Sequence, residues 1–133
     1  MSHVVFRMQA EVRWRDMDAF DHVNNASYLG YIEEARVRWF RSLGDDWAGA
    51  AAAPILAAVT ANYRRPITWP ETLTVELIAD RIGTKSLTLG HRIVSSGDPD
   101  RLYCDGHTVL VWVNRAGESV PLPDDVRAAC APG

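Results

Sequence analysis

The chain has few of the features that mark specialised classes of protein. Its 133 residues include two cysteines, Cys104 and Cys130, which are too few for a disulfide framework and lack the spacing of a zinc site. No segment approaches the roughly 18 apolar residues of a membrane span, and residues 1–10 contain no apolar signal core. The net charge is only −3, with scattered basic residues. These absences predict a soluble, cytoplasmic protein that binds neither nucleic acid nor membranes.

Several familiar catalytic motifs are also missing. The sequence contains no G-x-S-x-G elbow, no Gly-rich phosphate loop and no paired C-x-x-C. Asp16, Asp18 and Asp21 begin like a calcium loop, but Phe20 occupies the third ligand position, and the required Gly and distal Glu are absent. With His22 this cluster could hold another divalent ion, although metal-binding histidines usually come in closer-matched sets. We therefore expect no metal and no cofactor.

The pattern of apolar residues indicates the order of the secondary structure. Strict alternation predicts four strands, over about residues 6–14, 59–64, 72–79 and 87–93, and a β-branched run predicts a fifth over 108–113. Apolar steps of three and four predict one long helix over about residues 26–43, ended by Gly44, and the tail at 123–129 suits a short helix. Residues 48–53 resemble a connection, and 97–100 a turn. One strand, a long helix and four strands that can pair as an antiparallel meander form a single α+β domain over residues 1–133.

The segment between the first strand and the long helix is the best candidate for chemistry. Residues 15–22 are polar, and Asn24 or Asn25 can cap the helix that follows. A helix start exposes unpaired N–H groups and carries roughly half a positive charge, so it can stabilise an oxyanion. A nearby carboxylate could attack a thioester carbonyl or deprotonate a water that does so. The residues alone leave the choice among Asp16, Asp18 and Asp21 open.

Five segments carry a resemblance to a known family. Residues 12–29 read VRWRDMDAFDHVNNASYL and are followed by EEAR at 33–36; YRRPI at 63–67, GTKSL at 83–87 and GHTVLV at 106–111 also match. Over about residues 5–115 the chain resembles the 4-hydroxybenzoyl-CoA thioesterase-like branch of the hotdog superfamily. The resemblance implies a hotdog fold, in which a five-stranded antiparallel sheet wraps a long central helix. It also implies a homodimer with active sites at the subunit interface, and we expect a dimer of dimers.

The same resemblance assigns roles to individual residues. It implies that Asp18 is the catalytic carboxylate, as nucleophile or general base, and that a backbone N–H near Asn25 polarises the thioester carbonyl. His22 could orient the loop or contact substrate, or be bonded to nearby backbone. Tyr28 and Tyr31 are candidates for lining the acyl pocket. The candidates for binding the phosphates and pantetheine of CoA are Arg64, Arg65, Thr84, Lys85 and Ser86.

The sequence thus predicts an acyl-CoA thioesterase, an enzyme that hydrolyses a thioester to a free acid and CoA. Two alternatives stay open: a thioesterase for acyl-carrier-protein substrates, and a non-catalytic hotdog module that binds acyl-CoA. Asp21 departs from the family pattern, which commonly has Gly there, and its extra carboxylate would crowd an anionic substrate or raise the pKa of Asp18.

The remaining polar and aromatic candidates are expected to serve structure. Asp16 is expected to bond the loop backbone, and His91 and His107 to be packing residues. Four of the five tryptophans are expected in the core or in dimer contacts: Trp14, Trp39, Trp69 and Trp112.

Overall fold

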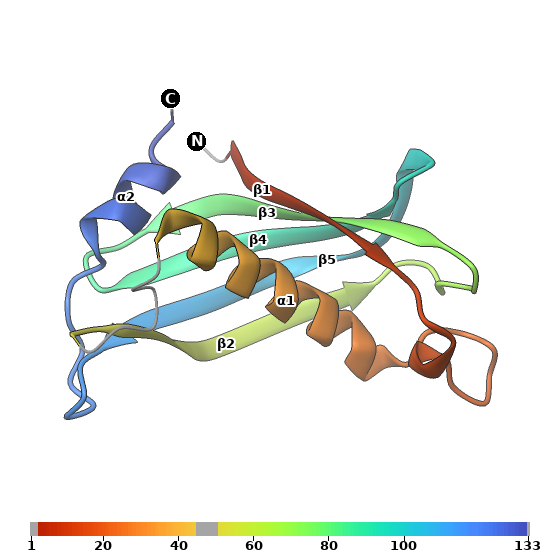
Figure 1. Ribbon diagram of the computed structural model, residues 1–133, viewed down its shortest axis with the longest axis horizontal. Helices are drawn as coiled ribbons and strands as arrows, with labels where there is room; N and C mark the ends of the chain where they lie inside the picture. The colour runs from red at the N-terminus through yellow and green to blue at the C-terminus, as the bar shows by residue number, and fades with distance from the viewer. Residues whose placement is uncertain (1–2, 45–50, 133) are drawn as a thin grey trace.

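A computed structural model describes residues 3–44 and 51–132. Figure 1 shows one long helix lying across a curved sheet, with a short helix near the C-terminus. The elements in chain order are β1 (His3–Glu11), a 3₁₀ turn η1 (Trp14–Asp16), α1 (Asn25–Leu43), β2 (Ala53–Tyr63), β3 (Thr72–Ile82), β4 (Ser86–Ser95), β5 (Asp98–Val113) and α2 (Asp124–Cys130). The α+β class and the long helix that follows the first strand are confirmed.

The five strands form one antiparallel sheet in the order β1-β3-β4-β5-β2. The expected meander holds for β3, β4 and β5 but is wrong for β2, which pairs with β5 at the edge of the sheet. The reason is the route of the chain, because α1 carries it across the sheet from β1 at one edge to β2 at the other (Figure 1). The alternation of side chains predicts which face of a strand is buried, but it does not predict which strand pairs with it.

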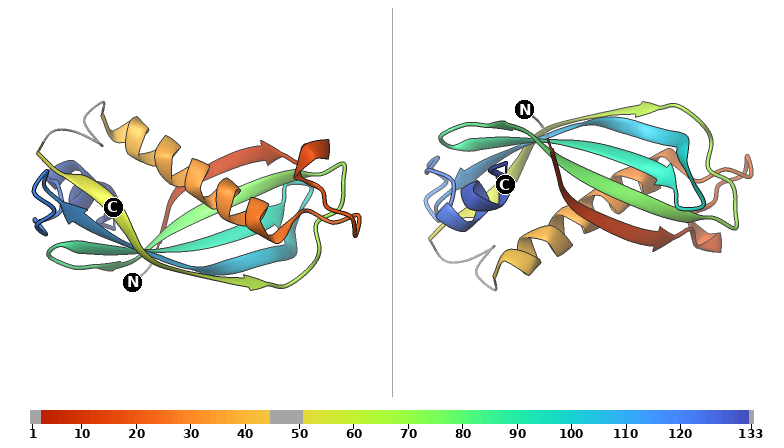
Figure 2. Two further views of the ribbon diagram at one scale, coloured as in Figure 1. Left: turned by 90° about the horizontal axis from the view of Figure 1, so that it is seen from below. Right: turned by 90° about the horizontal axis from the view of Figure 1, so that it is seen from above.

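The core lies between α1 and the concave face of the sheet, as the two turned views in Figure 2 show. One side of α1 is buried because apolar residues recur at helical spacing, and alternate residues of β3 and β4 face it. The buried side chains include Ile32, Ala35 and Trp39 of the helix, Leu73, Val75 and Leu77 of β3, and Leu87, Leu89 and Ile93 of β4. This packing fixes the helix start relative to the strand ends.

Some boundaries differ from the sequence prediction. β1 ends at Glu11 because the chain then turns, with the Asp16 N–H donating to the Arg13 carbonyl at 2.9 Å. The turn before β5 lies at residues 96–97, so β5 begins ten residues earlier than expected, at Asp98 rather than 108. Of the expected connection at 48–53, residues 48–50 lie outside the described part and 53 already belongs to β2.

The four tryptophans expected in the core or in dimer contacts divide into a buried pair and an exposed pair. Trp39 and Trp112 are buried in the core, as expected. Trp14 is 69% exposed and packs edge-on against exposed Trp69, with ring centroids 5.2 Å apart, so neither belongs to the core. Among the described residues, no helix is both long and apolar enough to cross a membrane.

Candidate active site

The loop between η1 and α1 is a tight closed turn built around Asp18. The Asp18 N–H donates to the His22 carbonyl at 2.9 Å, and the Asp21 N–H returns to the Asp18 carbonyl at 3.2 Å. One carboxylate oxygen of Asp18 accepts the Phe20 N–H at 2.8 Å. The other oxygen has no hydrogen bond to any residue that the structure describes. Asp18 is therefore held by one oxygen and has the second available.

Asp16 anchors this loop to the rest of the protein. Its buried carboxylate accepts the Arg13 N–H at 2.9 Å, the Arg13 guanidinium at 3.0 Å and the Tyr31 hydroxyl at 2.7 Å. Burial alone would raise the pKa of Asp16, but these hydrogen bonds from Arg13 and Tyr31 outweigh it and hold the pKa below its usual value. The Asp16 carbonyl also accepts the Asn24 N–H at 2.8 Å. Asp16 thus joins the loop to the start of α1.

Tyr31 lies with this anchor. It is buried, and burial together with its bond to Asp16 raises the pKa of its hydroxyl. The sequence placed Tyr31 in the acyl pocket, whereas the structure turns its hydroxyl toward the loop and leaves it out of the hollow described below.

The start of α1 presents one free donor. The Asn24 side chain caps the helix by accepting the Ala26 N–H at 2.9 Å, and the Ser27 N–H donates to the Asn24 carbonyl at 2.9 Å. The Asn25 N–H is left without an acceptor within residues 3–44 and 51–132. No acidic residue stands in the first turn, so the positive end of the helix is not neutralised locally. The sequence suggested a backbone N–H near Asn25 as the oxyanion donor, and the N–H of Asn25 itself is the one that has no acceptor among the described residues.

Asp18 and Asn25 line the same hollow, of about 400 Å³. The remaining lining residues are Phe20, His22, Val23, Tyr28, Tyr63, Arg64, Arg65 and Pro66. The structure thus brings together six of the ten predicted site residues: Asp18, His22, Asn25, Tyr28, Arg64 and Arg65. The His22 imidazole has no hydrogen-bond partner in the part of the chain that the structure describes. Two residues that line one cavity thus carry a free carboxylate oxygen and a free N–H, and these are the groups that acyl transfer requires.

Two tyrosines tie the helix start to the connection after β2. The Tyr63 hydroxyl donates to the Asn25 carbonyl at 3.2 Å, and the Tyr28 hydroxyl donates to the Arg65 carbonyl at 3.3 Å. Their rings meet edge-on, with centroids 4.9 Å apart. Tyr63 was not among the predicted site residues, because its alternation with Asn62 and Arg64 identified it only as part of a strand. Two signals in the sequence could have located it: the match of YRRPI at 63–67 to the family, and the adjacent Arg64 and Arg65.

The backbone conformation of Asp21 explains why the family commonly has Gly at this position. Its φ of 61° is in the left-handed region, which Gly adopts freely and which Asp and Asn tolerate better than most residues. The side chain is exposed and is not part of the hollow's lining. The conformation of the loop therefore accounts for a Gly preference at this position without any contact to substrate.

Thr84, Lys85 and Ser86 lie away from this hollow. They belong to the turn between β3 and β4, where the Gly83 N–H donates to the Ser86 carbonyl at 2.8 Å and Arg127 of α2 donates to the Gly83 carbonyl at 2.9 Å. Figure 1 shows this turn beside α2, at the opposite end of the sheet from the Asp18 loop. A single chain does not bring these three residues to Asp18.

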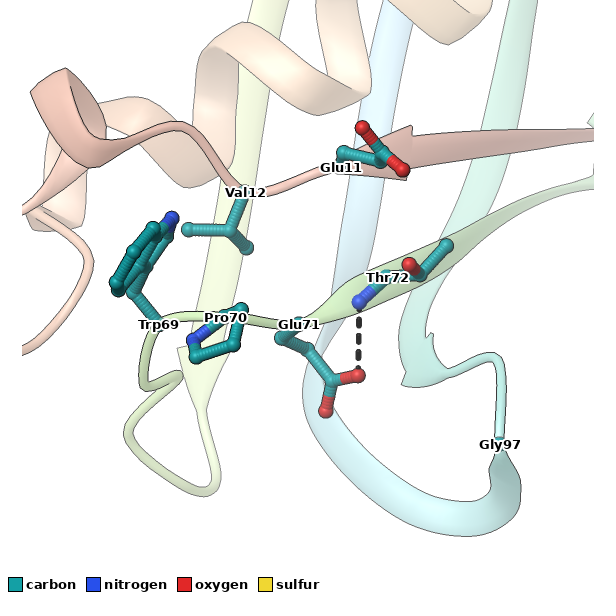
Figure 3. Close-up of a pocket in the computed structure, with 7 residues that line it drawn as sticks. All are labelled: Glu11, Val12, Trp69, Pro70, Glu71, Thr72 and Gly97. Atoms are coloured by element: carbon teal, nitrogen blue, oxygen red, sulfur yellow. Dashed lines mark hydrogen bonds between the residues drawn. The ribbon is translucent and has the colours of Figure 1, made fainter.

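A larger hollow, of about 580 Å³, lies where β1 meets β3 (Figure 3). Its best-placed carboxylate is already engaged, because Glu71 accepts the Thr72 N–H at 2.9 Å with one oxygen and the Tyr103 hydroxyl with the other. Among the described residues that line it, none belongs to the N-terminus of a helix. The smaller hollow is therefore the better candidate for catalysis.

Comparison with known proteins agrees with this fold. The pattern of the thioesterase-like superfamily matches residues 12–130. A proposed thioesterase of Pseudomonas aeruginosa shares 46% identity and superposes with a TM-score of 0.92, over 97% of this chain and 100% of that one. A proposed acyl-CoA thioesterase of Xanthomonas campestris shares 42% identity, with a TM-score of 0.82 over 90% and 100% of the two chains. A thioesterase of Thermus thermophilus, solved with coenzyme A and Zn, shares 32% identity, with a TM-score of 0.82 over 96% and 92%.

Proposed function

The chain belongs to the thioesterase-like superfamily and is a thioester hydrolase of the hotdog fold, and from this premise we propose that it hydrolyses acyl-CoA with Asp18 as the catalytic carboxylate. The observation that carries the proposal is the pairing of two free groups on one hollow, the second oxygen of Asp18 and the N–H of Asn25. A thioester carbonyl oxygen that accepts the Asn25 N–H would present its carbon to Asp18. A single donor of this kind typically contributes about 10²- to 10³-fold to the rate.

Either of two routes fits this arrangement. As a nucleophile, Asp18 attacks the carbonyl carbon, the bond to sulfur breaks, and CoA leaves as a thiolate that takes a proton from water; a second water then hydrolyses the mixed anhydride and restores Asp18. As a general base, Asp18 takes a proton from water while that water attacks the carbonyl carbon; the bond to sulfur then breaks, and the departing thiolate takes that proton from Asp18, which restores the carboxylate. Both routes give a free carboxylic acid and CoA.

The rest of the hollow suits the other parts of an acyl-CoA. Arg65 forms no ion pair within the described residues, and Arg64 is exposed, although Asp105 lies 3.1 Å from it. Both can meet CoA phosphates. The Thermus thermophilus relative solved with coenzyme A supports this choice of carrier. Tyr28 forms part of the wall for the acyl group, and His22 is free to contact the substrate.

The proposal includes assembly as a homodimer, and as a dimer of such dimers. β2 is an edge strand whose concave-face residues Leu56, Val59 and Tyr63 are exposed, as expected where another sheet edge pairs. If two β2 strands pair antiparallel about a two-fold axis, each chain's turn at 83–86 lies at the end of the dimer that holds the other chain's Asp18. Thr84, Lys85 and Ser86 would then bind CoA across the interface, which a single chain cannot achieve.

Hydrolysis of a panel of short, long, branched and aromatic acyl-CoAs tests the reaction and the acyl preference together. We expect release of CoA thiol from at least one class, and none from the same class with Asp18→Asn. Tight CoA binding without hydrolysis anywhere in the panel would instead favour a binding module. Turnover restricted to acyl-carrier-protein thioesters would favour the other alternative.

A further inference from the structure

Arg36 is a buried cation without a partner. It lies on α1 and is only 8% exposed, yet it forms no hydrogen bond or ion pair with any residue in the described part of the chain. Burial lowers the pKa of its guanidinium, and the only opposing influence is the charge of Glu33 acting through space. The guanidinium nitrogens keep some contact with solvent, but burying most of a guanidinium with no protein acceptor is still unfavourable. An acceptor outside the single folded chain would remove this cost.

A neighbouring pair on the same helix shows what is unusual here. Glu34 and Arg38, spaced i,i+4, form an exposed ion pair of 2.9 Å. Glu33 and Arg36, spaced i,i+3, form none, and Glu33 is exposed without an ion pair to a described residue. The two opposite charges instead border one hollow of about 180 Å³ between α1 and β2, which could admit a carboxylate side chain.

The surface around this hollow is apolar and lies along the open edge of the sheet. Leu29 and Val37 are exposed on the same side of α1 as Glu33 and Arg36, and Leu56 and Val59 are exposed on the facing side of β2. An exposed apolar strip with one cation and one anion at its middle has the composition of an interface rather than of a solvated face.

The direction of the helix makes this surface complementary to itself. α1 runs antiparallel to β2, because Asn25 meets Tyr63 at one end and Phe40 borders the hollow with Pro54 at the other. A two-fold axis through the middle of paired β2 strands therefore passes beside the middle of α1, where Glu33 and Arg36 lie. In such an interface, if residue i of one copy contacts residue j of the other, the reverse contact also forms.

We propose that a second copy of this chain docks on the α1–β2 face and that its Glu33 enters the hollow to pair with Arg36, the contact forming twice across the axis. The inference rests on the two-copy assembly proposed above and specifies which charges hold it. The dimer then depends on charge, and Arg36 has the acceptor that the single chain lacks.

Charge exchange tests the pairing in the full-length protein by sedimentation equilibrium. Glu33→Arg, on an exposed side chain, is expected to raise the dimer Kd at least about tenfold because two pairs are lost per dimer. Arg36→Glu should do the same. The double variant E33R/R36E regenerates both pairs with their charges reversed and should restore the Kd to within about threefold of wild type. Glu34→Arg, an equal change of charge on the other flank of the helix, is the matched control and should leave the Kd within about twofold.

Circular dichroism checks that each variant is folded. If R36E fails to fold, the dimer Kd values of E33R and Glu33→Gln still test the pairing. An E33R dimer as tight as wild type, or a double variant no tighter than the singles, would overturn the pairing while leaving the assembly standing. A monomeric wild-type chain would overturn both. Hydrolysis of acyl-CoA is measured separately, so failure of the proposed reaction is distinguishable from either result.

Discussion

Asp16 and Asp18 stand two residues apart in one loop, yet their surroundings are opposite. Asp16 is buried and accepts hydrogen bonds from the Arg13 backbone, the Arg13 guanidinium and the Tyr31 hydroxyl. Asp18 is half-buried and lines a hollow, and its carboxylate accepts one hydrogen bond, from the Phe20 N–H, so that its second oxygen has no partner in the described residues. A carboxylate whose lone pairs are occupied can hold a structure, whereas one with a free oxygen can react. These surroundings suit Asp16 to anchoring the loop, and they support the proposal that Asp18 is the reacting carboxylate.

The largest expected effect on stability comes from Asp16→Asn. The change removes a buried charge that three donors surround, and we expect a loss of about 2–3 kcal/mol in the free energy of unfolding. Urea unfolding followed by circular dichroism measures it. The matched variant Asp18→Asn, in the same loop, should change this free energy by less than about 1 kcal/mol. Equal losses from the two variants would contradict the division of roles.

The pH dependence of that loss sharpens the same comparison. The pKa of Asp16 is lowered in the folded state, so its stabilising contribution is complete above the unfolded pKa of about 3.9 and is lost as the pH falls through the lower folded value. The difference in unfolding free energy between wild type and Asp16→Asn should therefore be full at neutral pH and shrink below about pH 4. A difference that grows on acidification would mean that Asp16 is held neutral.

Tyr31→Phe should have a smaller effect, because it removes one of the donors to Asp16 and leaves the three Arg13 hydrogen bonds in place. We expect a loss of about 1.5 kcal/mol in stability. If Tyr31 acts only through the loop, kcat should fall modestly and by a similar factor for every acyl-CoA. A change in acyl-chain preference would instead return Tyr31 to the acyl pocket. Steady-state kinetics on two substrates of different chain length distinguish these results.

The smallest effect is expected from Asp21→Gly. Glycine adopts the φ of 61° without steric cost, so the variant should be more stable than wild type by about 0.5 kcal/mol. Thermal unfolding with replicate samples measures the gain. KM for acyl-CoA should stay unchanged because Asp21 lies outside the hollow's lining. A clear drop in KM would show that its carboxylate repels the substrate after all.

The sequence predicted what depends on periodicity and local chemistry. The strands, the position of α1 and a cap at Asn24 or Asn25 follow from side-chain patterns, and the structure confirms them with Asn24 as the cap. The pairing of β2 with β5 could not be predicted, because it depends on where α1 delivers the chain. The available N–H at Asn25 became identifiable only once the hydrogen bonds of Ala26 and Ser27 were known.

The site shows the same limit. The residues alone could not choose among Asp16, Asp18 and Asp21, since type and spacing are similar and the distinction lies in three-dimensional contacts. Resemblance to a family selected Asp18, and the hydrogen bonds supply a physical reason for that choice. Tyr31 and Tyr28, three residues apart on one helix, were predicted alike, yet only Tyr28 reaches the hollow. Thr84, Lys85 and Ser86 lie far from Asp18 because β3 runs toward the opposite end of the sheet, and the alternation of side chains does not predict the direction of a strand.

The turnover of Asp18→Asn and Asp16→Asn, measured side by side on folded protein with a substrate that the wild type hydrolyses, tests the central claim most directly. With Asp18 as the reacting carboxylate, its variant should lose at least about 10³-fold in kcat while keeping wild-type stability and CoA affinity. Asp16→Asn should be the less stable of the two variants. At a temperature where both are folded, it should nevertheless retain a higher kcat than Asp18→Asn. Undiminished turnover by Asp18→Asn would contradict the account.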